Sequence, residues 1–145
     1  MPLPPPPPRG EGERGVVIVA SGADEALLFR ALATCRAIRR GGSRLPVELF
    51  HIGASEAFAA AARRELAALG GVTLRDLRAA PVAAPIAATA AGRLRFHAKP
   101  YAVLASRFAE LLLLDADVML FQPPERFFAR PGPFGALKRP QRFPQ

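Results

Sequence analysis

The feature that most constrains this 145-residue chain is a run of four leucines, residues 111–114, that leads directly into Asp115-Ala116-Asp117. A short, unbroken apolar run is typical of a strand buried on both faces, as in the middle of a parallel sheet. Residues i and i+2 of an extended chain point to the same side. Asp115 and Asp117 are therefore expected to present two carboxylates together at the carboxyl end of a central strand.

Two neighbouring carboxylates at that edge predict a divalent cation. Ligands of open α/β sheets bind at the carboxyl ends of the strands, and hard cations such as Mg²⁺ take oxygen ligands that they share with substrate phosphates. Apolar residues resume at Val118–Phe121, and charges in apolar surroundings are costly unless they are paired or bound to a metal. The alternative is a simple turn, in which each carboxylate accepts hydrogen bonds from local backbone N–H groups.

Upstream, the chain alternates between short apolar runs and amphipathic stretches. Further strands are expected at 16–20, 46–52 and 72–74, and helices from about residue 24 to 40 and from 55 to 69. Ser21 and Asp24 have the spacing of a capping box, and Ser55 is expected to cap the second helix, whose apolar face includes Phe58. This alternation predicts an α/β fold with a mostly parallel sheet and flanking helices.

A third helix is expected from Lys99 to about Phe108, with Pro100 in its first turn. Because only a short turn joins this helix to the leucine strand, the helix is expected to run antiparallel to the strand. Lys99 then lies near the carboxyl edge, where a helix N-terminus also favours phosphate. Residues 78–92 are expected to form a loop, either a functional lid or a poorly ordered excursion, and a short helix is expected near 123–128.

The ends of the chain differ from its middle in composition. Residues 1–14 are rich in proline and are expected to form an extended linker, residues 15–130 form the folded unit, and residues 131–145 are expected to be irregular. A sheet of four or five strands begins, but its second half is expected to lie outside this chain. The sequence therefore resembles the N-terminal part of a larger domain.

The composition excludes several classes of partner and site. The net charge is +8, but the only lysines are Lys99 and Lys138 and the arginines are scattered, so no nucleic-acid partner is predicted. No apolar stretch reaches about 18 residues, and the N-terminus lacks an apolar signal core, so no membrane span or signal peptide is expected. Cys35 is the only cysteine, which excludes an internal disulfide and a cysteine metal cluster.

The order of these pieces resembles that of a known enzyme family. The matching stretches are 15–19, 45–50, 99–108, 110–117, 122–124 and 127–128. Together they resemble a glycosyltransferase of the GT-A fold, most closely the fungal-type α-1,3-mannosyltransferase family (glycosyltransferase family 71). The resemblance implies an enzyme that moves a hexose from a nucleotide-diphosphate sugar, GDP-mannose or a UDP-sugar, to a glycan or glycoprotein acceptor, in the Golgi if it follows the eukaryotic family.

The resemblance also implies roles for individual residues. Asp115 and Asp117 would bind Mn²⁺ or Mg²⁺ together with the donor diphosphate. Lys99 would lie near the donor phosphates, and Ser21 and Gly22 near the nucleoside. The catalytic residue of such an enzyme is expected beyond Gln145.

Two other functions remain open at this point. The chain could be an inactive, truncated nucleotide-binding fragment. It could also be a phosphatase of the haloacid dehalogenase type, in which the first aspartate of an Asp-x-Asp pair is the nucleophile. The phosphatase is disfavoured because its aspartates normally follow the first strand, whereas here they follow 114 residues of chain.

Overall fold

Strands and helices alternate along most of the chain, as predicted. The computed structural model describes residues 13–80, 98–129 and 136–138. The strands are β1 (Arg14–Val19), β2 (Val47–His51), β3 (Val72–Asp76), β4 (Glu110–Asp115) and β5 (Leu137–Lys138). The helices are α1 (Glu25–Arg40), α2 (Ala60–Leu69), α4 (Ala98–Ala105) and α5 (Glu125–Phe128), with single 3₁₀ turns at Ala54–Glu56 and Leu77–Ala79.

The five strands form one sheet in the order β3-β2-β1-β4-β5, in which the first four are parallel and β5 is antiparallel. The leucine strand β4 pairs with β1 over its whole length, from Arg14↔Glu110 to Val19↔Asp115, and with β5 on its other side. The expected α/β fold with a mostly parallel sheet is therefore confirmed, and the aspartate pair follows an interior strand.

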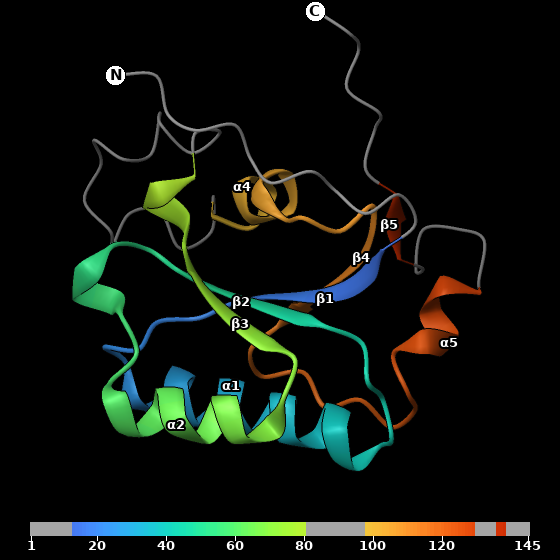
Figure 1. Cartoon of the computed structure of the whole chain (residues 1–145), viewed down its shortest axis with the longest axis horizontal. Coiled ribbons are helices and arrows are strands. Elements are labelled where there is room, and N and C mark those ends of the chain that lie inside the picture. The colour runs from blue at the N-terminus through green and yellow to red at the C-terminus, as the bar shows by residue number, and fades with distance from the viewer. Residues whose placement is uncertain (1–12, 81–97, 130–135, 139–145) are drawn as a thin grey trace, which may run out of the picture.

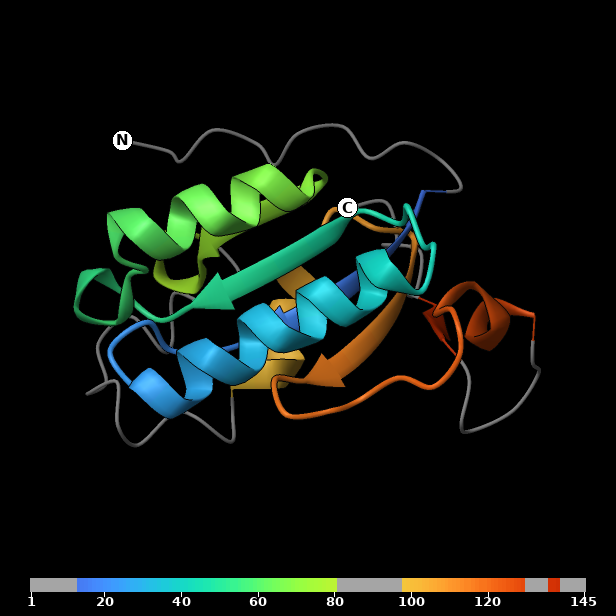
Figure 2. The same ribbon diagram turned by 90° about the horizontal axis from the view of Figure 1, so that it is seen from below.

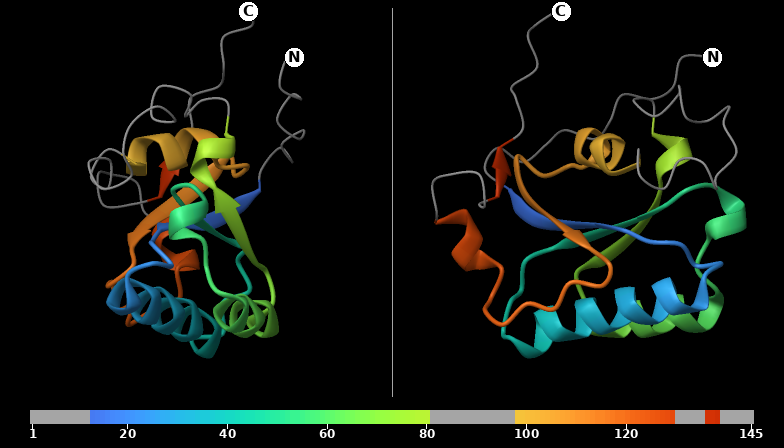
Figure 3. Two further views of the ribbon diagram at one scale, coloured as in Figure 1. Left: turned by 90° about the vertical axis from the view of Figure 1, so that its left-hand side faces the viewer. Right: turned by 180° about the vertical axis from the view of Figure 1, so that it is seen from behind.

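Helices cover both faces of the sheet. The helices α1 and α2 lie side by side on one face and α4 lies on the other (Figures 1 and 3). Alternate residues of β1, β2 and β4 enter the two resulting cores: Val16 and Leu112 pack with α1 and α2, whereas Val17 and Leu111 pack with α4. This alternation explains why the run of leucines has no polar position, because both faces of β4 are covered.

Helix α1 begins later than the capping-box spacing suggests. The N-cap is Asp24, whose carboxylate accepts a hydrogen bond from the N–H of Leu27 at 3.1 Å. Ser21 still belongs to the segment that leaves β1, and its Oγ accepts from the N–H of Ala23 at 3.2 Å. The prediction that Ser21 caps this helix is wrong because the cap must immediately precede the first helical residue, Glu25.

The second helix also begins later than expected. Ser55 lies within the 3₁₀ turn and does not cap α2, which starts at Ala60 without a side-chain cap. Between them the backbone is extended at Ala57, with ψ at 145°. This extension turns Phe58 into the core beneath the sheet, where it is buried as predicted, and an aromatic ring contributes strongly to a core.

Helix α4 crosses the sheet, so the prediction that it runs antiparallel to β4 is wrong. Its first turn lies beside the end of β4, where Lys99 contacts Asp115, and its last carbonyl, that of Ala105, accepts from Arg75 of β3 at 3.0 Å. Eight helical residues span about 12 Å, close to the roughly 14 Å that separate four neighbouring strands. The helix is accordingly seen end-on in Figure 1, where the strands are seen along their length.

The return from α4 to β4 is longer than the sequence suggests. Helix α4 ends at Ala105 and not near Phe108. Phe108 is instead buried against β1 at Gly15, where an added Cβ would lie 2.2 Å from the phenylalanine ring. The residues after α4 thus bring the chain back to the start of β4, and the short-turn argument behind the antiparallel prediction does not apply.

The remaining predictions concern the ends and one loop. Strand β5 lies within residues 131–145, which were expected to be irregular. Most of the expected linker at 1–14 and most of the expected loop at 78–92 lie outside the described residues. Among the residues that the structure describes, the helices are all too short or too polar to cross a bilayer.

Candidate functional site

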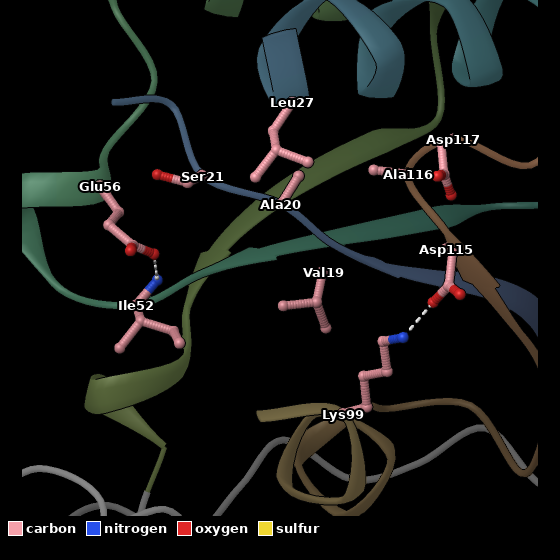
Figure 4. A pocket seen from close by; sticks show the side chains of 10 residues that line it. All are labelled: Val19, Ala20, Ser21, Leu27, Ile52, Glu56, Lys99, Asp115, Ala116 and Asp117. Atoms are coloured by element: carbon pink, nitrogen blue, oxygen red, sulfur yellow. Dashed lines mark hydrogen bonds and ion pairs between the residues drawn. The ribbon is translucent and has the colours of Figure 1, made fainter. Parts of the chain in front are cut away.

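A pocket of about 330 Å³ opens at the carboxyl edge of the sheet, between β1 and β4. Figure 4 shows its walls. The residues that follow β1 and β4 form two of them, and α1, α4 and the segment after β2 complete the rest: Val19, Ala20, Ser21, Leu27, Ile52, Glu56, Lys99, Asp115, Ala116 and Asp117.

The strand order explains why a pocket forms there. From β1 the chain passes through α1 to β2 on one side, whereas β4 lies on the other side of β1 and is reached through α4 on the opposite face. The helices next to β1 and β4 thus lie on opposite faces: in Figure 2, the view from below, α1 is in front of the sheet and α4 is behind it. Such a topological switch point is where open α/β sheets bind their ligands.

Asp115 ends β4 and begins a turn. The N–H of Val118 donates to the carbonyl of Asp115 at 3.1 Å, which closes the turn. The Asp115 carboxylate forms an ion pair with the ammonium group of Lys99 from the first turn of α4. The prediction that Lys99 points to the same edge as the aspartates is therefore confirmed, although α4 reaches that edge by crossing the sheet.

Asp117 contacts a cation from the opposite layer. Its Oδ2 lies 3.9 Å from Nη1 of Arg30 on α1. The sequence places a turn here as one alternative, and a turn does form. However, the contacts that the structure describes for the two carboxylates are with side-chain cations, one from each helical layer, and both carboxylates stay more than half exposed.

Thr34 holds this turn against α1, a role that was not predicted from the sequence. Its hydroxyl lies 2.8 Å from the carbonyl oxygen of Ala116 and 3.2 Å from that of Val118. Thr34 is buried on the inner side of α1. A threonine among apolar residues at helical spacing was the available signal, because a buried hydroxyl requires a partner.

Ser21 and Gly22 take different positions although they are neighbours. Ser21 lines the pocket, whereas Gly22 does not. The N–H of Gly22 donates to the carbonyl of Glu56 at 2.8 Å, and a Cβ at Gly22 would lie 2.5 Å from the carbonyl oxygen of Ala57. The pocket therefore gathers Ser21, Lys99 and the two aspartates, and Gly22 lets the backbones behind the pocket wall approach closely.

Glu56 is a further polar residue of the pocket, and it was not predicted from the sequence. Its carboxylate is buried, and Oε2 accepts from the N–H of Ile52 at 3.3 Å. In Figure 4 it lies at the other end of the pocket from Asp115 and Asp117. Like Ser21 after β1, it belongs to the segment that follows a parallel strand, so the rule that parallel strands end at one edge could have found it.

The residues of the pocket suit a cation such as Mg²⁺, which needs few protein ligands, better than a metal that is held by protein side chains alone. In the described ranges, no three histidine, cysteine, aspartate or glutamate side chains gather closely enough to hold a metal alone. Asp115 and Asp117 supply two hard oxygen donors. Mg²⁺ and similar ions commonly take one or two carboxylates and complete their shell with water and substrate phosphates.

Comparison with protein families decides how this arrangement is interpreted. The family model described as "Mannosyltransferase putative" matches residues 13–132. The chain belongs to this mannosyltransferase family. The match includes every residue of the pocket wall. No curated protein matches the chain significantly.

Membership in a mannosyltransferase family supports glycosyl transfer and not phosphate hydrolysis. The phosphatase alternative therefore loses its basis. A mannosyltransferase takes its sugar from an activated donor, so the pocket at the switch point is the natural place to look for that donor.

Proposed function

We propose that this mannosyltransferase-family protein has the GT-A fold and binds a nucleotide-diphosphate sugar and a divalent cation in the pocket between β1 and β4. The hexose, mannose in the first instance, passes to a glycan or glycoprotein acceptor. The observation that carries the proposal is the convergence of Asp115, Asp117 and Lys99 on one pocket at the switch point of the sheet.

The charges of the pocket suit the chemistry of sugar transfer. The bond from the anomeric carbon to the diphosphate breaks, and negative charge grows on the leaving diphosphate. Asp115 and Asp117 would hold Mn²⁺ or Mg²⁺, which supplies Lewis-acid neutralisation at the diphosphate when bound. Lys99 adds a mobile positive charge from the opposite wall, so the aspartates would act on the diphosphate through the cation they hold and Lys99 would attract it directly.

The remainder of the pocket suits the nucleoside. Val19, Ala20, Leu27 and Ile52 provide an apolar wall between the acidic end and Glu56. Ligand pockets of this kind combine apolar walls with a few polar groups that fix orientation. We place the diphosphate beside the aspartates and the nucleoside toward Glu56, with GDP-mannose as the first donor to test and UDP-sugars as the alternative.

The first test is metal-dependent donor binding. We expect GDP-mannose or a UDP-sugar to bind in calorimetric titrations with Mn²⁺ and to lose most of its affinity in EDTA. Asp115→Asn and Asp117→Asn should each weaken binding by roughly tenfold or more, because each removes one charged ligand while keeping its shape. Thermal stability should change little, since both carboxylates are exposed.

Glu65→Gln is the matched control, because Glu65 is an exposed acid on α2 that pairs with Arg36 away from the pocket. It should bind donor like the unmodified chain. Equal donor affinity in both asparagine variants, with and without EDTA, would rule out the metal–diphosphate site. Donor binding without transfer to any glycan acceptor would favour the nucleotide-binding fragment over the active enzyme.

A further inference from the structure

Both aspartates of the pocket already have a positive partner in the folded chain. Lys99 contacts Asp115, and Arg30 lies 3.9 Å from Asp117. Only Lys99 lines the pocket. If Asp115 coordinates a metal ion, that ion and the ammonium group of Lys99 compete for the same carboxylate.

We propose that Lys99 is an exchangeable counterion, which pairs with Asp115 before a ligand binds and transfers to the donor diphosphate when a metal ion takes its place. This inference rests on the proposed function. It adds that the cation and the nucleotide diphosphate bind cooperatively, because either one that binds alone leaves charges in the pocket without an opposite partner.

The geometry around Lys99 permits such an exchange. Its side chain is 38% exposed and that of Asp115 is 51% exposed, and ion pairs between solvated partners are held only weakly. The ammonium group sits on a flexible four-carbon stem. Phosphate oxygens that share a metal with Asp115 would lie within the reach of that stem, so Lys99 can change partners while α4 stays in place.

The charges around Lys99 differ between a metal ion that binds alone and one that binds together with a diphosphate. A divalent ion that displaces Lys99 from Asp115 leaves an unpaired ammonium group beside a second positive charge. When a diphosphate is present, the ammonium group has a new anionic partner. Thermodynamic linkage requires the effect to be reciprocal, so the diphosphate must raise the affinity for the metal by the same factor as the metal raises that for the diphosphate.

Arg30 supplies a matched comparison. It also pairs with one of the two aspartates, but it extends from α1 and does not line the pocket. Removal of Arg30 takes away one positive charge near the carboxylates without taking away a group that faces the donor. The two substitutions therefore separate a general charge effect from an exchange of partners.

The experiment measures Mn²⁺ and GDP binding separately on the full chain. In Lys99→Met, the affinity for Mn²⁺ alone should rise about two- to tenfold, because the competing cation is gone. The affinity for GDP at saturating Mn²⁺ should fall by roughly tenfold, because the diphosphate loses a charged partner. Lys99→Arg should keep both affinities within about threefold of the unmodified chain, as it keeps the charge.

In Arg30→Met, the GDP affinity at saturating Mn²⁺ should stay within about twofold of the unmodified chain, because Arg30 lies outside the pocket wall. Circular dichroism should show that the variants are folded, and Lys99→Gln replaces Lys99→Met if that variant is not.

Changes of opposite sign in the two affinities support the exchange, because damage to the fold would weaken both and a simple phosphate ligand would affect only GDP. An unchanged or weaker affinity for Mn²⁺ alone in Lys99→Met would overturn it. If Asp115→Asn still abolished Mn²⁺-dependent GDP binding in that case, the proposed function would stand without the exchange. A failure of the unmodified chain to bind Mn²⁺ with or without GDP would remove both.

Discussion

At the scale of single residues, Thr34 connects the stability of the fold to the shape of the pocket. Its hydroxyl contacts two carbonyls of the turn that carries Asp115 and Asp117. We expect Thr34→Val to lower the free energy of unfolding by about 1–2 kcal/mol, because buried carbonyls lose a donor. Because the turn also loses its tether, Mn²⁺-dependent GDP affinity should fall several-fold in calorimetry.

Thr34→Ser keeps the hydroxyl and is the control for this prediction. It should preserve most of the GDP affinity, although it removes a buried methyl group. Loss of stability in Thr34→Val with unchanged GDP affinity would mean that Thr34 supports the fold and does not shape the pocket.

Cys35 makes the stability of the protein fall as the pH rises in the alkaline range. Burial raises the pKa of its thiol from 9.0 to about 11, against a smaller opposite effect of Arg39. The folded state therefore keeps the proton more tightly than the unfolded state. The contribution of the buried, protonated thiol to the free energy of unfolding is fully present below about pH 9 and is lost as the pH rises through about 11.

Urea denaturation of the unmodified chain and of Cys35→Ala at pH 8 and pH 11 tests this. The unmodified chain should lose about 2 kcal/mol more than the variant between the two pH values. The comparison removes the effect of other groups that titrate in the same range. Equal losses in both proteins would show that the thiol is solvated in the folded state.

The position of a residue was predicted correctly from the sequence where the end of a strand determined it. Asp115 and Asp117 were placed correctly at the end of an interior strand because a buried run and its end are both visible in the sequence. The prediction that the two carboxylates point to the same side is wrong, because a turn follows Asp115 and they contact cations from opposite helical layers. Their partners were not predicted equally well: Lys99 was expected at this edge, but Arg30 and Thr34 were not. Side chains on a helix far away in sequence can be assigned to a turn only when the packing of that helix is known.

At the scale of elements, α4 is held across the sheet by a buried acid. Glu48 of β2 is fully buried, and its Oε1 lies 2.6 Å from Nη1 of Arg75. The N–H of Arg107, just beyond α4, lies 3.3 Å from Oε2 of Glu48. One carboxylate thus ties β2, β3 and the end of α4 together.

We expect Glu48→Gln to lower the free energy of unfolding by about 2–4 kcal/mol, because it leaves the half-buried Arg75 without its charged partner. Guanidinium denaturation measures the change. Glu65→Gln, which removes one member of an exposed pair, should cost well under about 1 kcal/mol. Similar small effects of both substitutions would mean that the Glu48 pair contributes no more than a surface pair.

The elements that the sequence predicted best are those with strong internal patterns, such as β4 and α1. The direction of α4 was wrong because it depends on Glu48 and Arg75, which are distant from α4 in sequence. Strand β5 was missed because Leu137–Lys138 is too short to show a pattern. It pairs with Glu110 and Leu111, so it depends on β4 for its existence.

At the scale of the whole molecule, donor binding should appear as a rise in melting temperature. A ligand that binds only the folded state stabilises it by about 2.7 kcal/mol at a hundredfold excess over its Kd. For a domain of this size, that corresponds to a shift of roughly 5–15 °C. We expect Mn²⁺ with GDP to produce this shift, and EDTA to remove it.

The same measurement on Asp117→Asn provides the control. This variant should melt near the temperature of the unmodified chain without ligands, yet respond much less to Mn²⁺ with GDP. A shift of the same size in Asp117→Asn, or one that survives EDTA, would place the binding of GDP elsewhere on the molecule.

The continuous pairing of β4 with β1 has a consequence for how quickly and how tightly a donor can be captured. Six paired positions hold the backbone up to Asp115 in register, so the entropy of ordering that backbone is lost during folding and not during binding. At β4 itself, side chains and not backbone remain to be immobilised when a ligand arrives, at about 0.5–1.5 kcal/mol for each long side chain. The strand therefore presents Asp115 from a backbone that is already ordered before the donor binds.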